Sequence, residues 1–231
     1  MPRVSWHGKS GLAWQVAETP FFDTKEGMNI RTIVFDFGNV LGLFSHRKAA
    51  EQLAVYSSAS VQAIQAYLFA EKLEQDFESG RIAPDVFMNL VRDACRLTCT
   101  DEQFRTAFAD MFTPNDSVCA LVPRLKRRYG LVLLSNTNAI HAGRFLDQFK
   151  TTLCHFDSLV LSHEVRLRKP DRRIYEHCLA VAGRPAKECL FIDDMPANVE
   201  AARACGWNAI QYRPGDDLSR QLADHGVALD G

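Results

Sequence analysis

Four short stretches of the sequence carry side chains that can bind a metal ion and a phosphoryl group. A carboxylate or a hydroxyl follows each of the apolar runs TIVF, LVLL and ECLFI, and a lysine stands in RKPDRR. The side chains are Asp36, Ser135, Asn136, Lys169, Asp193 and Asp194. Carboxylates provide the oxygen ligands that Mg²⁺ prefers, and lysine, hydroxyl and amide groups donate hydrogen bonds to phosphoryl oxygens. Together these residue types indicate a site for a polyanion and a metal ion.

The apolar runs that precede these residues have the composition of buried strands. Contiguous apolar or β-branched residues predict strands at 31–36, 131–135, 158–162, 188–193 and 207–212. Helical patterns separate the later strands, at 116–129, 138–149, 171–182 and 196–206. Strands that alternate with helices predict an α/β fold with a Rossmann-like parallel sheet. Because ligands of such sheets bind beyond the carboxyl ends of the strands, the distant side chains are expected to meet at one edge.

A helical segment interrupts this alternation between the first and second strands. Apolar residues recur at helical spacing in the runs 46–56, 60–77, 83–97 and 100–112, and no convincing strand lies among them. Ser60, Pro84 and Thr100 are of the residue types that begin helices. We therefore predict a core domain of residues 28–43 and 113–231 and an inserted all-helical domain of residues 44–112. Residues 1–27 are predicted to be a loosely ordered N-terminal extension.

The stretches DFGNV, LLSNTN, RKPDRRIY and FIDDMPAN resemble the four motifs of the haloacid dehalogenase (HAD) superfamily. They occur in order over residues 31–213, and the helical insert resembles the C1-type cap of this superfamily. The motifs look most like those of bacterial phosphatases of α-D-glucose 1-phosphate and of the N-terminal phosphatase domain of soluble epoxide hydrolase. The resemblance implies a Mg²⁺-dependent phosphatase of small, sugar-phosphate-like metabolites.

The resemblance also implies a set of metal ligands. Asp36 is expected to attack phosphorus, to form an aspartyl-phosphate and to bind Mg²⁺. The main-chain carbonyl of Gly38 is a second expected ligand. Asp194 is the expected direct carboxylate ligand of the fourth motif, and Asp193 is expected to bind through water or to orient the site.

The remaining motif residues are expected to bind the phosphoryl group. By resemblance, Ser135 and Asn136 donate hydrogen bonds to its oxygens, and Lys169 neutralises charge between the nucleophile and the transferring group. Asn198 is expected to orient Asp194 or Lys169. Together with the metal ion, these groups would stabilise the charge of the transition state.

One position departs from the usual phosphatase pattern that the resemblance implies. An aspartate is expected two residues after the nucleophile, where it protonates the leaving oxygen, but Gly38 stands there and Asn39 follows. General acid–base catalysis typically contributes about 10²–10⁴ in rate. Three functions stay open: a slower or selective phosphatase, a 2-haloacid dehalogenase, or a non-catalytic or very weakly active binding protein. The paired acids at 193 and 194 argue against the dehalogenase, because halide release needs no metal ion.

The composition is that of a globular protein without a strong charge bias. The formal net charge of −1 gives no bulk attraction to nucleic acid or to an anionic membrane. No apolar run approaches the length of a membrane span. We expect a small phosphorylated molecule as the partner, and neither nucleic acid nor membrane. Seven scattered cysteines without a CxxC pair predict reduced, mostly buried thiols in a cytoplasmic protein.

The insert offers few candidates for substrate recognition. Three charged residues of the insert lie near the expected rim of the site, but charged side chains on helices more often face solvent, and we expect that position for them. These residues are Arg47, Glu78 and Arg81. Three histidines are expected to be helix or loop residues and not metal ligands, because a hard-oxygen site has no need of them. They are His141, His163 and His177.

Overall fold

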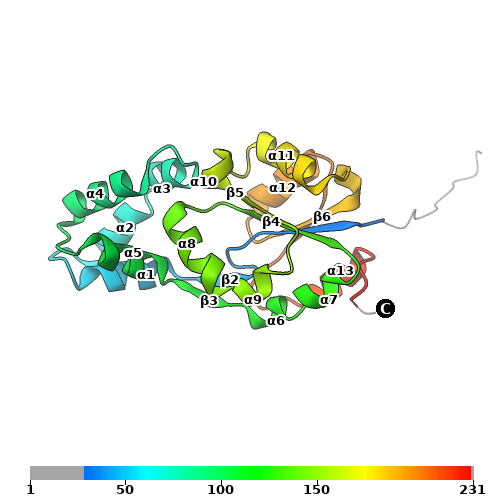
Figure 1. The fold of residues 1–231 in the computed structure, drawn as a ribbon, viewed down its shortest axis with the longest axis horizontal. Helices are drawn as coiled ribbons and strands as arrows, with labels where there is room; N and C mark the ends of the chain where they lie inside the picture. Colours follow the sequence, from blue (N-terminus) through cyan, green and yellow to red (C-terminus); the bar gives the residue numbers. More distant parts are fainter. Residues whose placement is uncertain (1–28, 230–231) are drawn as a thin grey trace, which may run out of the picture.

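The computed structural model describes residues 29–229, in which a sheet domain carries a helical domain at one end (Figure 1). Five parallel strands form the main sheet in the order β5-β4-β1-β6-β7. They are β1 (Thr32–Phe35), β4 (Gly130–Ser135), β5 (Ser158–Leu161), β6 (Cys189–Asp193) and β7 (Asn208–Gln211). Each begins and ends within one residue of its predicted bounds, so the predicted parallel α/β sheet is confirmed. The extension predicted at residues 1–27 lies outside the described residues.

Helices cover both faces of the sheet and bury its apolar side chains. Successive side chains of a strand point to opposite faces, so Ile33 and Phe35 enter one buried cluster while Val34 enters another. The first face is covered by α6 (Asp116–Cys119), α7 (Val122–Lys126), α8 (Ala139–Gln148), α9 (Lys150–Leu153) and α13 (Leu218–Asp224). The second is covered by α11 (Arg172–Ala182) and α12 (Pro196–Ala204), with α10 (Ser162–Val165) and the 3-10 turn η1 (Ala186–Glu188) at its margin. Burial on both faces explains why these strands read as continuous apolar runs.

The inserted domain consists of helices between the first two strands of the main sheet. They are α1 (His46–Ala54), α2 (Val61–Leu68), α3 (Glu71–Glu78), α4 (Pro84–Cys95) and α5 (Asp101–Ala109). The insert joins the core through two short strands that the sequence did not predict, β2 (Gly42–Phe44) and β3 (Phe112–Pro114). They pair antiparallel, with Phe44 opposite Phe112. Asn115 fixes this junction, because its side-chain amide donates to the Val40 carbonyl at 2.8 Å and to the Tyr212 hydroxyl at 3.0 Å.

Local capping chemistry places the ends of the predicted helices. The hydroxyls of Ser60 and Thr100 accept hydrogen bonds from backbone amides in the first turns of α2 and α5, and Pro84 lies in the first turn of α4. The helix predicted at 116–129 is instead divided into α6 and α7, because Pro123 lacks the N–H that a continuous helix requires. The helix predicted at 60–77 is divided at Phe69, and this break carries no glycine or proline signal.

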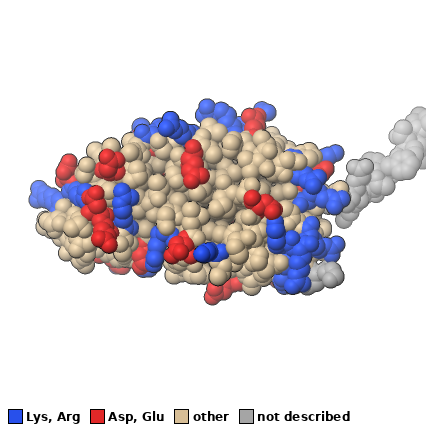
Figure 2. Space-filling view, in the orientation of Figure 1, with Lys and Arg blue, Asp and Glu red and all other residues tan. Residues whose placement is uncertain are grey.

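Charged residues of both signs are spread over the surface (Figure 2). Lysines and arginines gather at the end away from the insert, where α7 and the following turn carry the basic stretch 123–130. The seven cysteines are free thiols, and Cys95, Cys99, Cys178 and Cys189 are buried. Within residues 29–229, every helix is too short or too polar to cross a membrane.

Candidate active site

The residues that the sequence singled out meet at the carboxyl edge of the main sheet. Asp36 follows β1, Ser135 ends β4, and Asp193 ends β6 with Asp194 next to it. These strand ends are level, because Phe35 of β1 lies opposite Leu133 of β4 and opposite Ile192 of β6. Lys169 enters from the loop between α10 and α11.

Lys169 is fully buried and lies between two carboxylates. Its Nζ is 2.8 Å from Oδ1 of Asp36 and 2.6 Å from Oδ2 of Asp193. Burial alone would lower the pKa of Lys169, but the two carboxylates outweigh it and the pKa is raised, which keeps the ammonium charged. Burial raises the pKa of Asp36 to about 8, while Lys169 opposes this increase and Asp193 adds to it. The positive charge of Lys169 therefore does not compensate the negative charge of the carboxylates around it.

Asn198 holds Asp193, which corrects the expected role of this asparagine. Its Nδ2 donates to both oxygens of Asp193, at 3.0 and 3.1 Å, and not to Asp194 or Lys169. The backbone N–H of Met195 donates to Oδ1 of Asp193 at 2.8 Å. Asp193 thus accepts hydrogen bonds on both oxygens, which leaves it little capacity for a direct metal bond and fits an orienting role.

Asp194 is held differently, through Asn39. The Nδ2 of Asn39 donates to Oδ2 of Asp194 at 2.9 Å, and Asn39 adopts a positive φ of 52° that asparagine tolerates better than most residues. Burial raises the pKa of Asp194, and the Asn39 hydrogen bond opposes the increase. Within residues 29–229, no other side chain donates a hydrogen bond to the Asp194 carboxylate, which can therefore also bind a cation.

The acidic side chains fit a divalent cation. Oxygen atoms of Asp36, Asp193 and Asp194 all lie within 4.8 Å of one another. When all of them are ionised, the three carboxylates and the ammonium group of Lys169 have a net charge of −2. Every candidate ligand atom is a hard oxygen. A bound Mg²⁺ would neutralise this net negative charge.

The second motif contacts the lysine loop through the side chain of Asn136. Both polar ends of the Asn136 side chain are occupied by the main chain of Lys169: Oδ1 accepts from its N–H at 2.8 Å, and Nδ2 donates to its carbonyl at 3.0 Å. The side-chain amide of Asn136 therefore positions the lysine loop, and Nδ2 carries a second hydrogen that these two contacts do not use. The Ser135 hydroxyl makes only a long hydrogen bond of 3.4 Å to the Asn136 carbonyl, so it can turn toward a ligand.

Phe44 occupies the space next to position 38. A Cβ atom on Gly38 would lie 3.0 Å from Cε1 and 3.4 Å from Cδ1 of the Phe44 ring. An acidic side chain at position 38 would therefore meet an aromatic ring that lines the cavity. The Phe44 ring therefore lies against the position that the side chain of an acid at residue 38 would enter.

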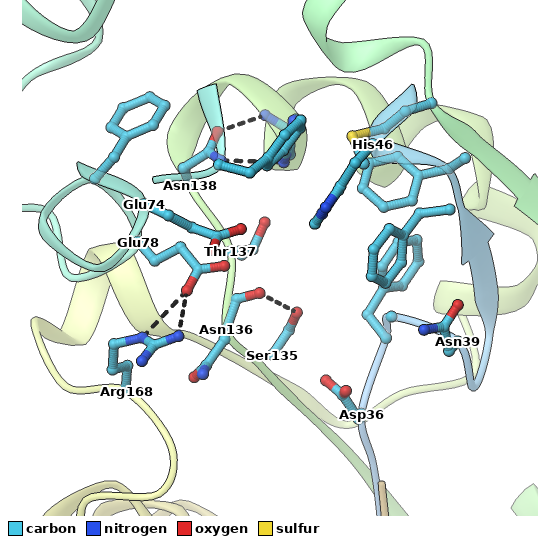
Figure 3. Close-up of a pocket in the computed structure, with 18 of the residues that line it drawn as sticks. Asp36, Asn39, His46, Glu74, Glu78, Ser135, Asn136, Thr137, Asn138 and Arg168 are labelled. Carbon is cyan, nitrogen blue, oxygen red and sulfur yellow. Dashed lines mark hydrogen bonds and ion pairs between the residues drawn. The ribbon is translucent and has the colours of Figure 1, made fainter. Parts of the chain in front are cut away.

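A cavity of about 290 Å³ extends from the carboxyl edge of the sheet to the inserted domain. Asp36 lies on one side of it, and Glu74 and Glu78 of α3 lie on the other (Figure 3). Oε2 of Glu78 accepts two hydrogen bonds from Arg168, at 3.1 and 2.8 Å. Burial raises the pKa of Glu78, and burial together with Glu78 raises the pKa of Glu74 to about 7.

Glu78 thus faces the cavity and not solvent, so the expectation of a solvated side chain was wrong. For Arg47 and Arg81 the expectation is confirmed, because they are exposed and pair with Glu51 and Asp76 on the surface. Two functional candidates were missed, Glu74 and Arg168. Arg168 precedes the predicted lysine directly, which is a usable signal, whereas the helical pattern around Glu74 gave none.

Aromatic rings form the cavity wall opposite the glutamates. His46 at the start of α1 stacks on Phe69, with ring centroids 3.6 Å apart and planes 9° apart, and Phe44 lies beside it at 5.0 Å. Burial lowers the pKa of His46. His141 is buried against Phe108, and burial lowers its pKa to about 3, which agrees with its expected structural role.

Comparison with known proteins assigns the chain to a family. The sequence pattern of haloacid dehalogenase-like hydrolases matches residues 30–206, which is most of the chain. The chain belongs to this family. It is therefore a HAD-like hydrolase, as the four motifs predicted, and its parallel sheet is the core of the HAD fold.

Two curated relatives match most of this chain over nearly their whole length. The D-ribitol-5-phosphate phosphatase of Bacteroides thetaiotaomicron is 26% identical over 84% of this chain and 97% of its own length. A phosphatase of Mycobacterium tuberculosis is 27% identical over 88% of this chain and 99% of its own length. Among solved structures, a HAD family enzyme from B. thetaiotaomicron in complex with magnesium and inorganic phosphate superposes with a TM-score of 0.73. It is 25% identical and covers 84% of this chain and 99% of that one.

Proposed function

We propose that this HAD-like hydrolase is a Mg²⁺-dependent phosphatase of small phosphorylated metabolites that acts through an aspartyl-phosphate. The observation that carries the proposal is the charge arrangement at the carboxyl edge of the sheet, where Lys169 lies between Asp36 and Asp193 and Asp194 stands within reach of the same point. The three acids and Lys169 have a net charge of −2, which suits a divalent cation. A cation site of oxygen ligands beside a buried lysine suits a phosphoryl group. The magnesium and phosphate complex of the structural relative supports both ligands.

Asp36 would supply the nucleophile. Lys169 holds Oδ1 of Asp36, and within residues 29–229 its Oδ2 has no hydrogen-bond partner. Oδ2 would attack phosphorus, the bond from phosphorus to the leaving oxygen would break, and the leaving oxygen would take a proton from water or from the substrate's own hydroxyls. A water molecule would then attack the phosphoryl group, release inorganic phosphate and restore the Asp36 carboxylate.

The other residues would hold this geometry and its charges. Asp36 and Asp194, with the Gly38 carbonyl, would bind Mg²⁺, which when bound stabilises negative charge on the phosphoryl oxygens. Asp193, held by Asn198, would fix Lys169 against the nucleophile. The Ser135 hydroxyl would donate to a phosphoryl oxygen. Asn136 would position the lysine loop through its side-chain amide, and the second hydrogen of Nδ2 would donate to a phosphoryl oxygen.

The dehalogenase alternative fits this cavity less well. A 2-haloacid carries a carboxylate that needs a free cationic partner, but Lys169 is paired with two acids and Arg168 is paired with Glu78. Attack on carbon by Asp36 would also leave the paired acids Asp193 and Asp194 without a metal ion to bind. In the binding-protein alternative, the site would hold a metal ion but would have no nucleophile in position. Turnover distinguishes a binding protein from a phosphatase.

The test is phosphate release from p-nitrophenyl phosphate and D-ribitol 5-phosphate with Mg²⁺, compared with EDTA. Asp36→Asn is expected to abolish release, whereas Asp93→Asn, an exposed control on α4, is expected to retain it. No release above the Asp36→Asn background would refute the phosphatase. Metal-independent halide release from 2-chloropropionate would identify a dehalogenase, and Mg²⁺-dependent phosphate binding without turnover would identify a binding protein.

A further inference from the structure

The volume of the cavity limits the size of the alcohol part of the substrate. At about 290 Å³ the cavity lies just below the usual range of small-molecule sites, about 300–1,000 Å³. It runs from Asp36 at the sheet edge to α3 and the start of α1 in the inserted domain (Figure 3). If phosphorus is bound at Asp36, the alcohol part of the substrate must lie in the half of the cavity next to the insert.

That half of the cavity has an excess of negative charge. Arg168 contributes a positive charge to this half of the cavity. Both hydrogen bonds from its guanidinium go to one oxygen of Glu78. Glu74 points into the cavity from the same helix and has no hydrogen-bond or ion-pair partner within residues 29–229 (Figure 3). Two ionised glutamates and one arginine leave a net charge of minus one. Lys169 does not change this balance, because two aspartates hold it.

The opposite wall is flat and uncharged. The ring of His46 lies parallel to the ring of Phe69, and the Phe44 ring lies next to it. Because burial lowers the pKa of His46, its ring is neutral at pH 8 and adds no positive charge to the wall. The wall therefore offers an apolar face for a ring or a carbon chain, directly across from the glutamates (Figure 3).

We propose that the Glu74 carboxylate selects the substrate by charge, as a specificity determinant of the phosphatase site proposed above. The alcohol part of the substrate carries an apolar face toward Phe44 and His46, and carries ammonium or hydroxyl groups toward Glu74. A second anionic group, such as a carboxylate or a second phosphate, is rejected. Phosphorylated amino alcohols and polyols are thus the fitting class, and phosphorylated acids are not.

Equilibrium binding tests this selection without relying on turnover. We would titrate the Mg²⁺-loaded protein at pH 8 with 4-(aminomethyl)-, 4-(hydroxymethyl)- and 4-(carboxymethyl)benzylphosphonate by isothermal titration calorimetry. The three probes differ in the charge at one end. At pH 8 Glu74 is mostly ionised, because its pKa is about 7. We expect at least about tenfold tighter binding of the amine than of the carboxylate, from one charge–charge contact screened by water in the cavity.

Two variants locate the effect. Glu74→Gln removes the charge at nearly constant shape, and we expect the amine-to-carboxylate ratio to fall to about threefold or less. Glu71→Gln is the matched control, since Glu71 lies on the same helix but is exposed, and its ratio is expected to stay that of the wild type. A wild-type protein that binds the carboxylate as tightly as the amine, or that binds none of the probes, would overturn the proposal without any variant. An unchanged ratio in Glu74→Gln would also overturn it.

Hydrolysis of the corresponding phenyl phosphates separates this inference from the proposed function. Charge-ordered binding without phosphate release would refute the phosphatase but keep the selection by Glu74. Phosphate release from all three esters, with no order of binding among the phosphonates, would keep the phosphatase and refute the selection.

Discussion

Replacing Gly38 with aspartate is expected to restore a general acid only when Phe44 is made smaller at the same time. The Gly38 backbone is not among the positive-φ glycines, so its conformation accepts a side chain. The obstacle is the Phe44 ring, whose Cε1 would lie 3.0 Å from the new Cβ and must move by a few tenths of an ångström. The single variant therefore presses its carboxyl against an aromatic ring, and Phe44→Leu opens the space that the carboxyl needs.

The size of the gain depends on the leaving group. A correctly placed acid is worth about 10²–10⁴ in rate, or about 3–5 kcal/mol of barrier, for an alcohol that must be protonated as it leaves. We expect the Gly38→Asp/Phe44→Leu double variant to raise kcat/KM for D-ribitol 5-phosphate into the lower part of that range. For p-nitrophenyl phosphate, whose phenolate leaves without a proton, we expect a change of less than about threefold.

Gly38→Asn/Phe44→Leu is the matched control, because asparagine has the shape of aspartate and cannot donate its amide proton as an acid. Steady-state kinetics of the double variants and of Phe44→Leu alone, with both substrates, make the comparison. Equal gains in the Asn and Asp variants, or equal gains for both substrates, would show that position 38 acts through shape and not through proton transfer, and would refute the reasoning.

Three further predictions concern stability. Mg²⁺ at about 100 times its Kd is expected to raise the free energy of unfolding by about 2.7 kcal/mol, and an Asp194→Asn variant that keeps this increase in thermal denaturation would contradict the assignment of a ligand. Lys169→Met is expected to cost about 3–5 kcal/mol in urea denaturation without metal, because Asp36 and Asp193 lose their buried cation; a cost below about 1 kcal/mol would contradict it. The pKa of Glu74 rises from 4.5 to about 7 on folding, so its contribution to stability is present below pH 4.5 and is lost as the pH rises through about 7. Glu74→Gln is therefore expected to gain about 1–2 kcal/mol relative to the wild type between pH 5 and pH 8, after allowance for water in the cavity, and the same gain at both values would refute this.

The sheet and the residues at its edge were predictable because their signals are local. A strand buried on both faces must be a short apolar run, and a polar residue that ends such a run must lie at the edge of the sheet. Asp36, Ser135, Asp193 and Asp194 could therefore be placed from the sequence. The carboxyl cluster followed from the parallel topology and needed no knowledge of individual contacts.

The partners of these residues were not predictable in the same way. The amide of Asn198 could reach several acceptors, and which acid it holds depends on side-chain geometry that no spacing specifies. The break at Phe69 has no local breaker residue; there the Phe69 ring stacks on His46 from another helix. Because that break aims α3 at the cavity, Glu74 was missed together with it. Tertiary contacts, not helix propensity, determine this part of the site.

The antiparallel pair of β2 and β3 has a consequence for how this protein could be altered. The chain leaves the core and returns to it through residues that face each other, Phe44 and Phe112, so both covalent connections to the insert lie side by side. The Cα atoms of such a pair are about 4.5–5.5 Å apart, a gap that a short turn can close. Another helical segment, or a tight hairpin, could therefore be joined between these two residues, if it supplies new partners for the core side chains that contact the insert, such as Arg168 and His141. Such an exchange would replace Glu74 and His46 in the cavity wall and would keep the residues at the carboxyl edge of the sheet.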